Sequence, residues 1–594
     1  MLVSPNSSRL VDWISEPRHD RGVRFADDTD GWRFVSYAEL AELCLRGAEQ
    51  IAAAGARPGG RVCVVMNTSE TGIAAFCATL LIGATVAPVA PPTHTVSGDY
   101  AGYLGRILAT ARPDVVVAEQ RFHVGVKAAL AAAELDAPVL AIDGSAPVPG
   151  HIPPVRAEYA LLQFTSGSTR APRGVLLTGA NVEAQQRLIT SWLDVSGELT
   201  AASWLPLHHD MGLVGLLLPA LVHQFDLRLL QPVQFIARPL RWLECFGRDG
   251  VWSTATPNFG LDWILRKVAP DDLQGMDFTT WRHLIIGAER VEFDVLRRFA
   301  ALLAPHGFDS RTLLPAYGLA EAALAVTGSG TDEIPSAIAV DPTTLQLGAA
   351  VRVLGTATLG EADDPAPVAE SDATRTWLTS CGSPLHSAQV RILGQDGTPV
   401  GDSVLGEVAI SGPSVTRAVL DEHRETAPFH DDWYHTGDAG FVCGTDLYLV
   451  GRMGDSMKVH GRTLFAEDIE SAVTAAAGAP KNRVTVLLGT DRGAPTVALL
   501  CERLKLPPEQ VLRVVRKLAG DQVVLRVLQV EQGTIARTTS GKPRRRHLWR
   551  QLTAGELADS ITAELGDRAE GATAVLADRT TAEAGDRAES ATVE

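Results

Sequence analysis

Cysteine is scarce in this chain, and the few cysteines present are scattered. No two of the seven have the spacing of a metal-ligand or redox pair, and their number is odd. This argues against a disulfide framework and favours reduced thiols in a cytoplasmic protein. The cysteines are Cys44, Cys63, Cys77, Cys245, Cys381, Cys443 and Cys501.

Positive charge and long apolar runs are also in short supply. Lysine and arginine number 53 against 70 acidic residues, a net charge of -17. Such a balance argues against non-specific binding to nucleic acid or to anionic membranes. The most apolar stretch, Met211 to Val222, is far shorter than the roughly 20 residues of a membrane span and contains Pro219. The N-terminus, MLVSPNSSRLVDW, lacks a signal-peptide pattern, so we expect a cytoplasmic protein without a membrane span.

The apolar residues that are present alternate between two periods. Residues 37–56 and 72–83 have helical spacing, whereas 61–66 and 85–92 are short runs typical of buried strands. Similar alternation continues to about residue 330. It predicts an α/β fold with a substantially parallel sheet, and the length of 594 residues predicts two to four structural units.

The second half of the chain changes character twice. Residues 330–376 are rich in Asp, Pro, Thr and Gly with weak periodicity, which predicts an insertion or long loop. Residues 377–450 alternate strand and turn signals. A boundary is predicted near 452–456, followed by a small α+β unit over 457–555.

The chain ends in a repetitive tail. The string AELGDRAEGAT at 563–573 recurs as AEAGDRAESAT at 582–592 and is nearly devoid of aromatics. This composition predicts disorder or a marginal exposed helix from about residue 556. The predicted units are therefore 1–453, 454–555 and a tail of 556–594.

The most informative motif is a run of small hydroxyl and glycine residues. An apolar strand in LLQFTSGSTRAPRGV (161–175) leads straight into this run, and a cation follows it. Exposed hydroxyls and flexible backbone N–H groups suit a loop that wraps a polyphosphate, although composition alone equally allows a solvated turn. The residues are Thr165, Ser166, Gly167, Ser168, Thr169 and Arg173.

Four further strings carry chemistry-bearing residues. Taken singly, each has an ordinary explanation: a buried histidine, a core tyrosine, an exposed glutamate or a solvated basic run. The strings are WLPLHHDMGLVG (204–215), LPAYGLAEAALAVT (314–327) with IIGAERV (285–291) upstream, WYHTGDAGF to the end of FAEDIE (433–470), and RTTSGKPRRR (537–546).

Together the five strings resemble the motifs of the adenylate-forming superfamily, in that family's order. This superfamily contains acyl-CoA synthetases, adenylation domains of peptide synthetases and luciferases. The His-His-Asp-Met-Gly form, the Ser-Thr-Arg loop and the stretch 330–376 resemble its fatty acyl-AMP ligase branch. Arg170 and Arg173 depart from the glycine and lysine of many members. The resemblance implies a large N-terminal unit of mixed α/β subdomains and a small mobile α+β C-terminal unit.

The resemblance also implies roles for single residues. The small-residue loop holds phosphates; Gly287, Ala288 and Glu289 line the adenine site; Tyr317 stacks on adenine; and Asp438 and Arg452 hold the ribose. Glu321 holds magnesium, and His209 lies near the substrate carboxylate. Lys542 neutralises charge near the α-phosphate. Asp455 is the hinge about which the C-terminal unit turns. Trp204 and Phe259 line an acyl tunnel.

The implied reaction uses ATP and Mg²⁺ to convert a fatty acid into acyl-AMP and then passes the acyl group to an acyl carrier protein of polyketide or peptide assembly. The basic run Arg544, Arg545 and Arg546 is expected to help recruit an acidic partner. An acyl-CoA synthetase shares every motif, and a non-catalytic adenylate-binding protein is a further alternative. An amino-acid activator fits less well, because such domains carry a different pocket motif. Small or aryl acids remain open as substrates.

Overall fold

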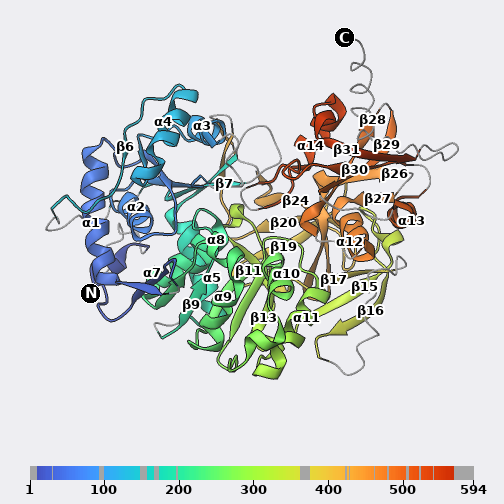
Figure 1. Ribbon diagram of the computed structural model, residues 1–594, viewed down its shortest axis with the longest axis horizontal. Coiled ribbons are helices and arrows are strands. Elements are labelled where there is room, and N and C mark those ends of the chain that lie inside the picture. Colours follow the sequence, from blue (N-terminus) through green and yellow to red (C-terminus); the bar gives the residue numbers. More distant parts are fainter. Residues whose placement is uncertain are drawn as a thin grey trace, which may run out of the picture.

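The computed structural model describes most of the chain as a large unit of several sheets and a smaller C-terminal unit. Figure 1 shows the first sheet in blue, the second mainly in green and the C-terminal unit in orange and red. The described residues are 10–29, 31–92, 100–147, 155, 157–165, 173–195, 198–360, 375–421, 424–426, 429–459, 462–477, 481–491, 493–502, 508–520, 523–538 and 541–567.

An eight-stranded sheet is formed mainly by the first 180 residues. Its core strands β4, β3 and β5 are parallel and almost wholly buried, as their continuous apolar runs predict. The order is β22 (Arg424–Thr426), β21 (Ala418–Asp421), β8 (Arg173–Leu177), β7 (Leu161–Thr165), β4 (Thr85–Val89), β3 (Arg61–Val65), β5 (Val115–Val117) and β6 (Val139–Leu140).

The predicted helices of this region are confirmed. The helix expected at 37–56 begins at the residue after Ser36, which forms a capping box with Glu39. The helix expected at 72–83 begins after Ser69, whose side chain accepts from Gly72 N. The helices are α1 (Tyr37–Ala53), α2 (Glu70–Leu81), α3 (Tyr100–Ala111) and α4 (His123–Ala132).

A nine-stranded sheet forms the middle of the large unit. Its strands from β13 to β1 are parallel, and helices connect most of them. The order is β18 (Ser383–Pro384), β14 (Ala325–Gly328), β13 (Leu313–Gly318), β12 (His283–Gly287), β11 (Ser253–Pro257), β9 (Thr200–Ser203), β10 (Asp226–Leu229), β1 (Gly22–Ala26) and β2 (Trp32–Ser36). The helices are α5 (Gly179–Leu193), α6 (Asp210–Gly212), α7 (Leu218–His223), α8 (Pro232–Ala237), α9 (Pro239–Gly247), α10 (Asn258–Lys267) and α11 (Phe293–Leu303).

Two smaller antiparallel sheets complete the large unit. A five-stranded sheet contains β19 (Gln389–Leu393), β20 (Gly406–Ser411), β24 (Trp433–Cys443) and β23 (Phe429–His430), with β25 (Asp446–Arg452) also paired to β24. A three-stranded sheet contains β16 (Val353–Thr358), β15 (Ser336–Val340) and β17 (Thr376–Thr379).

The expectation of one irregular stretch at 330–376 is wrong for much of its length. β15 pairs with both β16 and β17, and four of its five residues are buried. Its run SAIAV is too short to stand out among the surrounding Asp, Pro and Thr residues, because strand periodicity over five residues is a weak signal. Residues 361–374 lie outside the described part of the chain.

The C-terminal unit is a small α+β domain, as predicted. Its four-stranded sheet has the order β28 (Val484–Asp491), β29 (Ala494–Glu502), β30 (Val524–Val530) and β31 (Ile561–Asp567). A two-stranded sheet of β26 (Ser456–Val459) and β27 (Arg462–Phe465) precedes it. The helices are α12 (Ala466–Ala477), α13 (Pro508–Ala519) and α14 (Arg545–Ala554).

The predicted start of the tail at residue 556 is wrong. Strand β31 pairs antiparallel with β30 through Asp567, and Arg526 Nε donates to Glu564 Oε1 at 2.7 Å across this pair. The first copy of the repeated string therefore contributes an edge strand, which its Ala, Glu and Asp content disfavours by local propensity. Backbone pairing with β30 outweighs that preference. Residues 568–594, including the second copy, lie outside the described residues.

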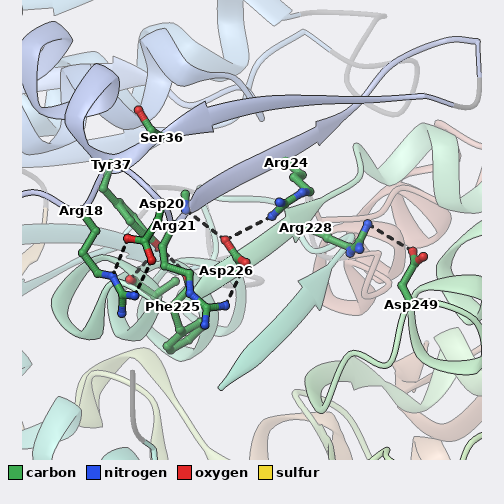
Figure 2. Close-up of polar contacts among 12 residues, drawn as sticks. Arg18, Asp20, Arg21, Arg24, Ser36, Tyr37, Phe225, Asp226, Arg228 and Asp249 are labelled. Atoms are coloured by element: carbon green, nitrogen blue, oxygen red, sulfur yellow. Dashed lines mark hydrogen bonds and ion pairs between the residues drawn. The ribbon is translucent and has the colours of Figure 1, made fainter. Parts of the chain in front are cut away.

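The N-terminal strands are held to the nine-stranded sheet by a buried carboxylate. Asp226 accepts from Gly22 N and lies 3.1 Å from Nη1 of both Arg21 and Arg24. Figure 2 shows the two arginines on either side of Asp226, and a separate pair of Arg228 with Asp249. Because the side chain of Asp226 is only 19% exposed, its charge requires these partners.

The two carboxylates in Figure 2 predict different stabilities for matched variants. Asp226→Asn leaves two arginines without their counter-charge, and we expect it to lower the free energy of unfolding by about 1–3 kcal/mol. Asp249→Asn breaks a pair whose carboxylate is 38% exposed, and its expected effect is below about 1 kcal/mol. Urea unfolding followed by tryptophan fluorescence measures both. Equal losses would contradict the assignment of Asp226 as the anchor.

None of the helices in the described ranges combines the length and apolar character that crossing a bilayer requires.

Candidate active site

Three predicted nucleotide contacts form one hydrogen-bonded group. Tyr317 lies on β13, Asp438 on β24 and Arg452 at the end of β25. The Tyr317 hydroxyl donates to Asp438 Oδ2 at 2.7 Å, and Arg452 Nε lies 2.9 Å from Asp438 Oδ1. Burial, followed by the charge of Asp438, raises the pKa of Tyr317 well above its ordinary range. Tyr317 therefore remains a hydrogen-bond donor, and two sheets meet around one buried carboxylate.

Glu321 lies in the same region, on a short 3₁₀ turn after β13. Tyr434 Oη donates to Glu321 Oε1 at 3.0 Å, and Thr416 N donates to the Glu321 carbonyl at 2.7 Å. Burial raises the pKa of the Glu321 carboxyl, and the hydrogen bond from Tyr434 acts in the opposite direction. The fields of Arg452 and Asp438 also reach Glu321, so this carboxylate belongs to the same electrostatic group.

The loop after β12 contains the three predicted adenine-site residues. Gly287 ends β12, and a side chain there would contact the Ala316 carbonyl at 3.1 Å. Ala288 has φ of 65°, a left-handed conformation that is unfavourable for a residue with a Cβ. The Glu289 carboxylate accepts from Phe259 N at the start of α10, which holds the loop in place. Such strained backbone is often found at functional sites.

The paired histidines lie on the loop between β9 and α6. Their rings are 4.7 Å apart, and burial, followed by the proximity of His209, lowers the pKa of His208 well below its ordinary range. His208 is therefore neutral near pH 7. Gln163 Nε2, on β7, donates to the His208 carbonyl at 2.8 Å and ties this loop to the eight-stranded sheet. One turn of π-helix (Leu213–Leu217) follows, a feature common at functional sites.

Lys542 approaches this histidine loop from the C-terminal unit. Burial raises the pKa of Asp210, which follows His209, and the charge of Lys542 partly opposes that rise. The exposed Lys542 lies on a turn closed by hydrogen bonds in which Thr538 N donates to the Lys542 carbonyl at 2.8 Å and Lys542 N donates to Thr538 Oγ1 at 3.1 Å. The lysine of the last motif therefore lies within electrostatic reach of the second motif.

The small-residue loop can be located only by its two ends. Thr165 ends β7 and Arg173 begins β8, where the two residues pair directly across the antiparallel strands. Arg173 also acts electrostatically on Tyr434, which places its cation near the Glu321 group. The remaining predicted phosphate contacts, Ser166, Gly167, Ser168 and Thr169, lie outside the described residues.

The two predicted tunnel residues lie on neighbouring elements. Trp204 is 6% exposed and stacks on Phe235, with ring centroids 4.0 Å apart and planes 4° apart. Gly260, which follows Phe259 on α10, leaves room for the Trp204 ring, since a Cβ there would lie 3.0 Å from Trp204 Cζ2. Trp204 and Phe259 remain predicted tunnel residues.

The predicted hinge residue is held by an arginine of the basic run. Asp455 Oδ2 lies 3.0 Å from Arg545 Nη1, and Arg545 also pairs with Glu470 at 2.8 Å and with Glu467 at 3.7 Å. The expectation that Arg545 helps to recruit an acidic partner is therefore wrong, because this side chain is buried among three carboxylates. Sequence alone gives no sign of this burial, since a run of three arginines is typical of a solvated surface.

Several side chains of this site were not singled out from the sequence. Tyr434 and Asp210 lie inside quoted motifs, but no pattern marked them as partners of Glu321 and Lys542. Arg290 lies one residue beyond the predicted adenine loop. Pairs this far apart in the chain are a property of the fold, so a single sequence contains no signal for them.

The arrangement brings together groups suited to a nucleotide and a carboxylate. A buried acid with a cation beside it can hold a diol, and a second acid can hold a metal on phosphates. A lysine near the histidine loop can neutralise charge at a reacting phosphate. Residues from four of the five motifs contribute to this described site, together with the ends of the fifth.

Comparison with known proteins gives consistent results. The family described as AMP-binding enzyme matches residues 16–420. FadD21 of Mycobacterium tuberculosis, named as a fatty-acid–CoA ligase, is 31% identical over 525 residues, covering 82% of this chain and 86% of that protein. A 4-hydroxyphenylalkanoate adenylyltransferase of the same species is 31% identical over 419 residues, covering 66% of this chain and 64% of that protein.

A solved structure gives the same relationship. It comes from a study of fatty acyl-adenylate ligases from E. coli and L. pneumophila, with a TM-score of 0.80 and 26% identity over 93% of this chain and 99% of that chain. The resemblance expected from the five motifs is confirmed. The family match covers more than half of the sequence, and the chain therefore belongs to the AMP-binding enzyme family of adenylate-forming proteins.

Proposed function

We propose that this protein uses ATP to activate the carboxylate of a fatty acid as acyl-AMP. A carboxylate oxygen attacks the α-phosphorus, forming a new P–O bond. The bond from the α-phosphorus to the oxygen bridging to the β-phosphate breaks, and pyrophosphate leaves. AMP is a good leaving group, so the acyl carbon becomes a good electrophile for a thiol.

The observation that carries this proposal is the clustering of Tyr317, Glu321 and Asp438. These residues are linked through Tyr434 and Arg452 into one buried group beside the strained loop at Ala288. We assign Asp438 and Arg452 to the ribose hydroxyls, and Tyr317 with Gly287, Ala288 and Glu289 to the adenine. The relatives named as a fatty-acid–CoA ligase and as fatty acyl-adenylate ligases support the choice of a fatty acid.

The remaining residues are assigned to the reacting groups. Lys542 stabilises negative charge on the α-phosphate as it develops, and His209 orients the substrate carboxylate. Thr165 and Arg173 hold the start and end of the loop around the β- and γ-phosphates. Trp204 and Phe259 are assigned to the wall of the acyl tunnel.

Magnesium fits the chemistry of this site. Tyr434 uses Oε1 of Glu321, and we assign Oε2 to the metal. Among the residues that the structure describes, no group of three His, Cys, Asp or Glu could hold a metal alone. One carboxylate combined with phosphate oxygens is the usual arrangement for this ion. When bound, it neutralises charge on the triphosphate.

We assign the second step to the phosphopantetheine thiol of an acyl carrier protein. In this step the C-terminal unit turns about Asp455, withdrawing Lys542 and admitting the thiol. The thiol sulfur attacks the acyl carbon, a thioester forms and AMP leaves. CoA is the competing acceptor, and the name of FadD21 favours it, whereas the adenylate ligase neighbours favour a product that is not handed to CoA.

Removing the lysine tests the first step. Lys542→Ala is expected to slow ATP–pyrophosphate exchange by about 10²–10³-fold, because one charge-stabilising group is lost from the transition state. Lys127→Ala, an exposed lysine on α4 outside the site, is the matched control and should leave exchange unchanged. Unchanged exchange in Lys542→Ala would overturn the adenylation mechanism.

The raised pKa of Glu321 predicts a pH dependence. A carboxyl with a raised pKa is protonated at a pH where a solvated glutamate is still ionised, so magnesium-dependent adenylation should fall on acidification earlier than for an ordinary glutamate. The Tyr434 hydrogen bond lowers this pKa, so Tyr434→Phe should move the acid limb of the rate profile to higher pH. A limb that stays in place would show that Glu321 does not control the step.

The acceptor is identified by one product analysis. Protein, ATP, magnesium and fatty acids of graded length are divided among no acceptor, CoA and a phosphopantetheinylated carrier protein, and mass spectrometry follows acyl-AMP and thioester. We expect acyl-AMP to persist with CoA and to be consumed with the carrier. Ready formation of acyl-CoA would instead identify an acyl-CoA synthetase. Absence of any adenylate would favour a binding protein or another class of acid.

A further inference from the structure

A buried ion pair joins the large unit to the C-terminal unit directly beside the adenine loop. Arg290 follows Glu289, and its Nη1 pairs with Oδ1 of Asp468 in the first turn of α12. The two side chains are only 16% and 17% exposed. Arg290 Nη2 also donates to the Trp377 carbonyl at 3.3 Å. The guanidinium is thus fixed on the large unit, and a carboxylate of the C-terminal unit meets its charge.

Helix α12 is in turn bonded to the segment that carries Lys542. Glu467 and Glu470, on either side of Asp468, pair with Arg545, which begins α14 three residues after Lys542. Glu470 Oε1 also accepts from Val486 N on β28 at 2.8 Å. The charge of Arg290 extends to Glu467 as well. The position of α12 therefore determines the position of the lysine-bearing turn.

A second contact between the units is weaker by its nature. Lys458 Nζ donates to Gln395 Oε1 at 3.2 Å, and both side chains are exposed. An exposed contact to a neutral amide contributes little to orientation. By contrast, a buried ion pair that loses one partner leaves an uncompensated charge in the protein. Arg290 and Asp468 thus have the stronger influence on how the units are oriented.

We propose that Arg290 is a positioning residue for adenylation: its ion pair with Asp468 holds the C-terminal unit where Lys542 reaches the reacting phosphate. This inference rests on the proposed function. The pair lies about the adenine loop on one side and the lysine-bearing unit on the other, so it serves the first half-reaction. The second half-reaction, in which Lys542 is withdrawn, does not need the pair.

Separate measurement of the two half-reactions tests this role. ATP–pyrophosphate exchange reports adenylation, and transfer from externally supplied acyl-AMP to the thiol acceptor identified above reports the second step. In Arg290→Gln and Asp468→Asn we expect exchange to fall by roughly 5–150-fold, the range of typical coupling between sites, with transfer maintained. The exchanged pair, Arg290→Asp with Asp468→Arg, should recover part of the lost exchange.

The matched control breaks an ion pair inside the large unit. Arg266→Gln removes the bond to Asp262 within α10, at 2.8 Å, and should leave both half-reactions unchanged. Unchanged exchange in both single variants would overturn the proposal. Equal loss of both half-reactions together with a lower melting temperature would also overturn it, because that result indicates a merely structural role. A wild-type protein without exchange activity would contradict the proposed function itself.

Discussion

The burial of two carboxylates at the meeting of two sheets is the constraint on which the site depends. Glu321 and Asp438 lie in a setting where an unpaired charge is costly, and each accepts a hydrogen bond from a tyrosine hydroxyl. Asp438 has Arg452 as a second partner. Since these partners come from β13, β24 and β25, the acids can be satisfied only when the nine-stranded and five-stranded sheets are correctly placed. The same oxygens are the groups that we assign to ribose and magnesium.

Charge also connects this site to the rest of the molecule. The chain is acidic overall, yet Arg290 and Arg545 are used in its interior, each against carboxylates of the C-terminal unit. Arginine suits this use because its planar group bonds several acceptors at once and remains ionised. The pairs fix orientation, and their breakage is the event that a turn of the C-terminal unit requires. Adenylation and thiol transfer thus become alternative states of one seam.

Much of the fold could be predicted from local patterns. Ser36 with Glu39 and Ser69 with Gly72 mark helix starts, and continuous apolar runs mark β3, β4 and β5. The errors arose where tertiary pairing outweighs composition. β15 is hidden among loop-forming residues, and β31 is a strand of poor propensity that forms by adding to the edge of a sheet.

The motifs placed the site in the right strings but did not specify its contacts. Tyr317, Asp438 and Arg452 were grouped by resemblance, and the structure brings them into one hydrogen-bonded group. The partners Tyr434, Asp210 and Arg290 required the fold, because each pair joins segments that no local period relates. The exposed fraction of Arg545 likewise depends on α12, which a basic run in sequence does not reveal.

The central claim is that the substrate carboxylate attacks the α-phosphorus of ATP. The most direct measurement uses a fatty acid labelled with oxygen-18 in its carboxylate, together with ATP, magnesium and a thiol acceptor, and analyses the released nucleotide by mass spectrometry. The account predicts AMP that carries one labelled oxygen and pyrophosphate that carries none, since the bridging oxygen of the adenylate remains with phosphorus. Unlabelled AMP, or ADP with label in inorganic phosphate, would contradict it.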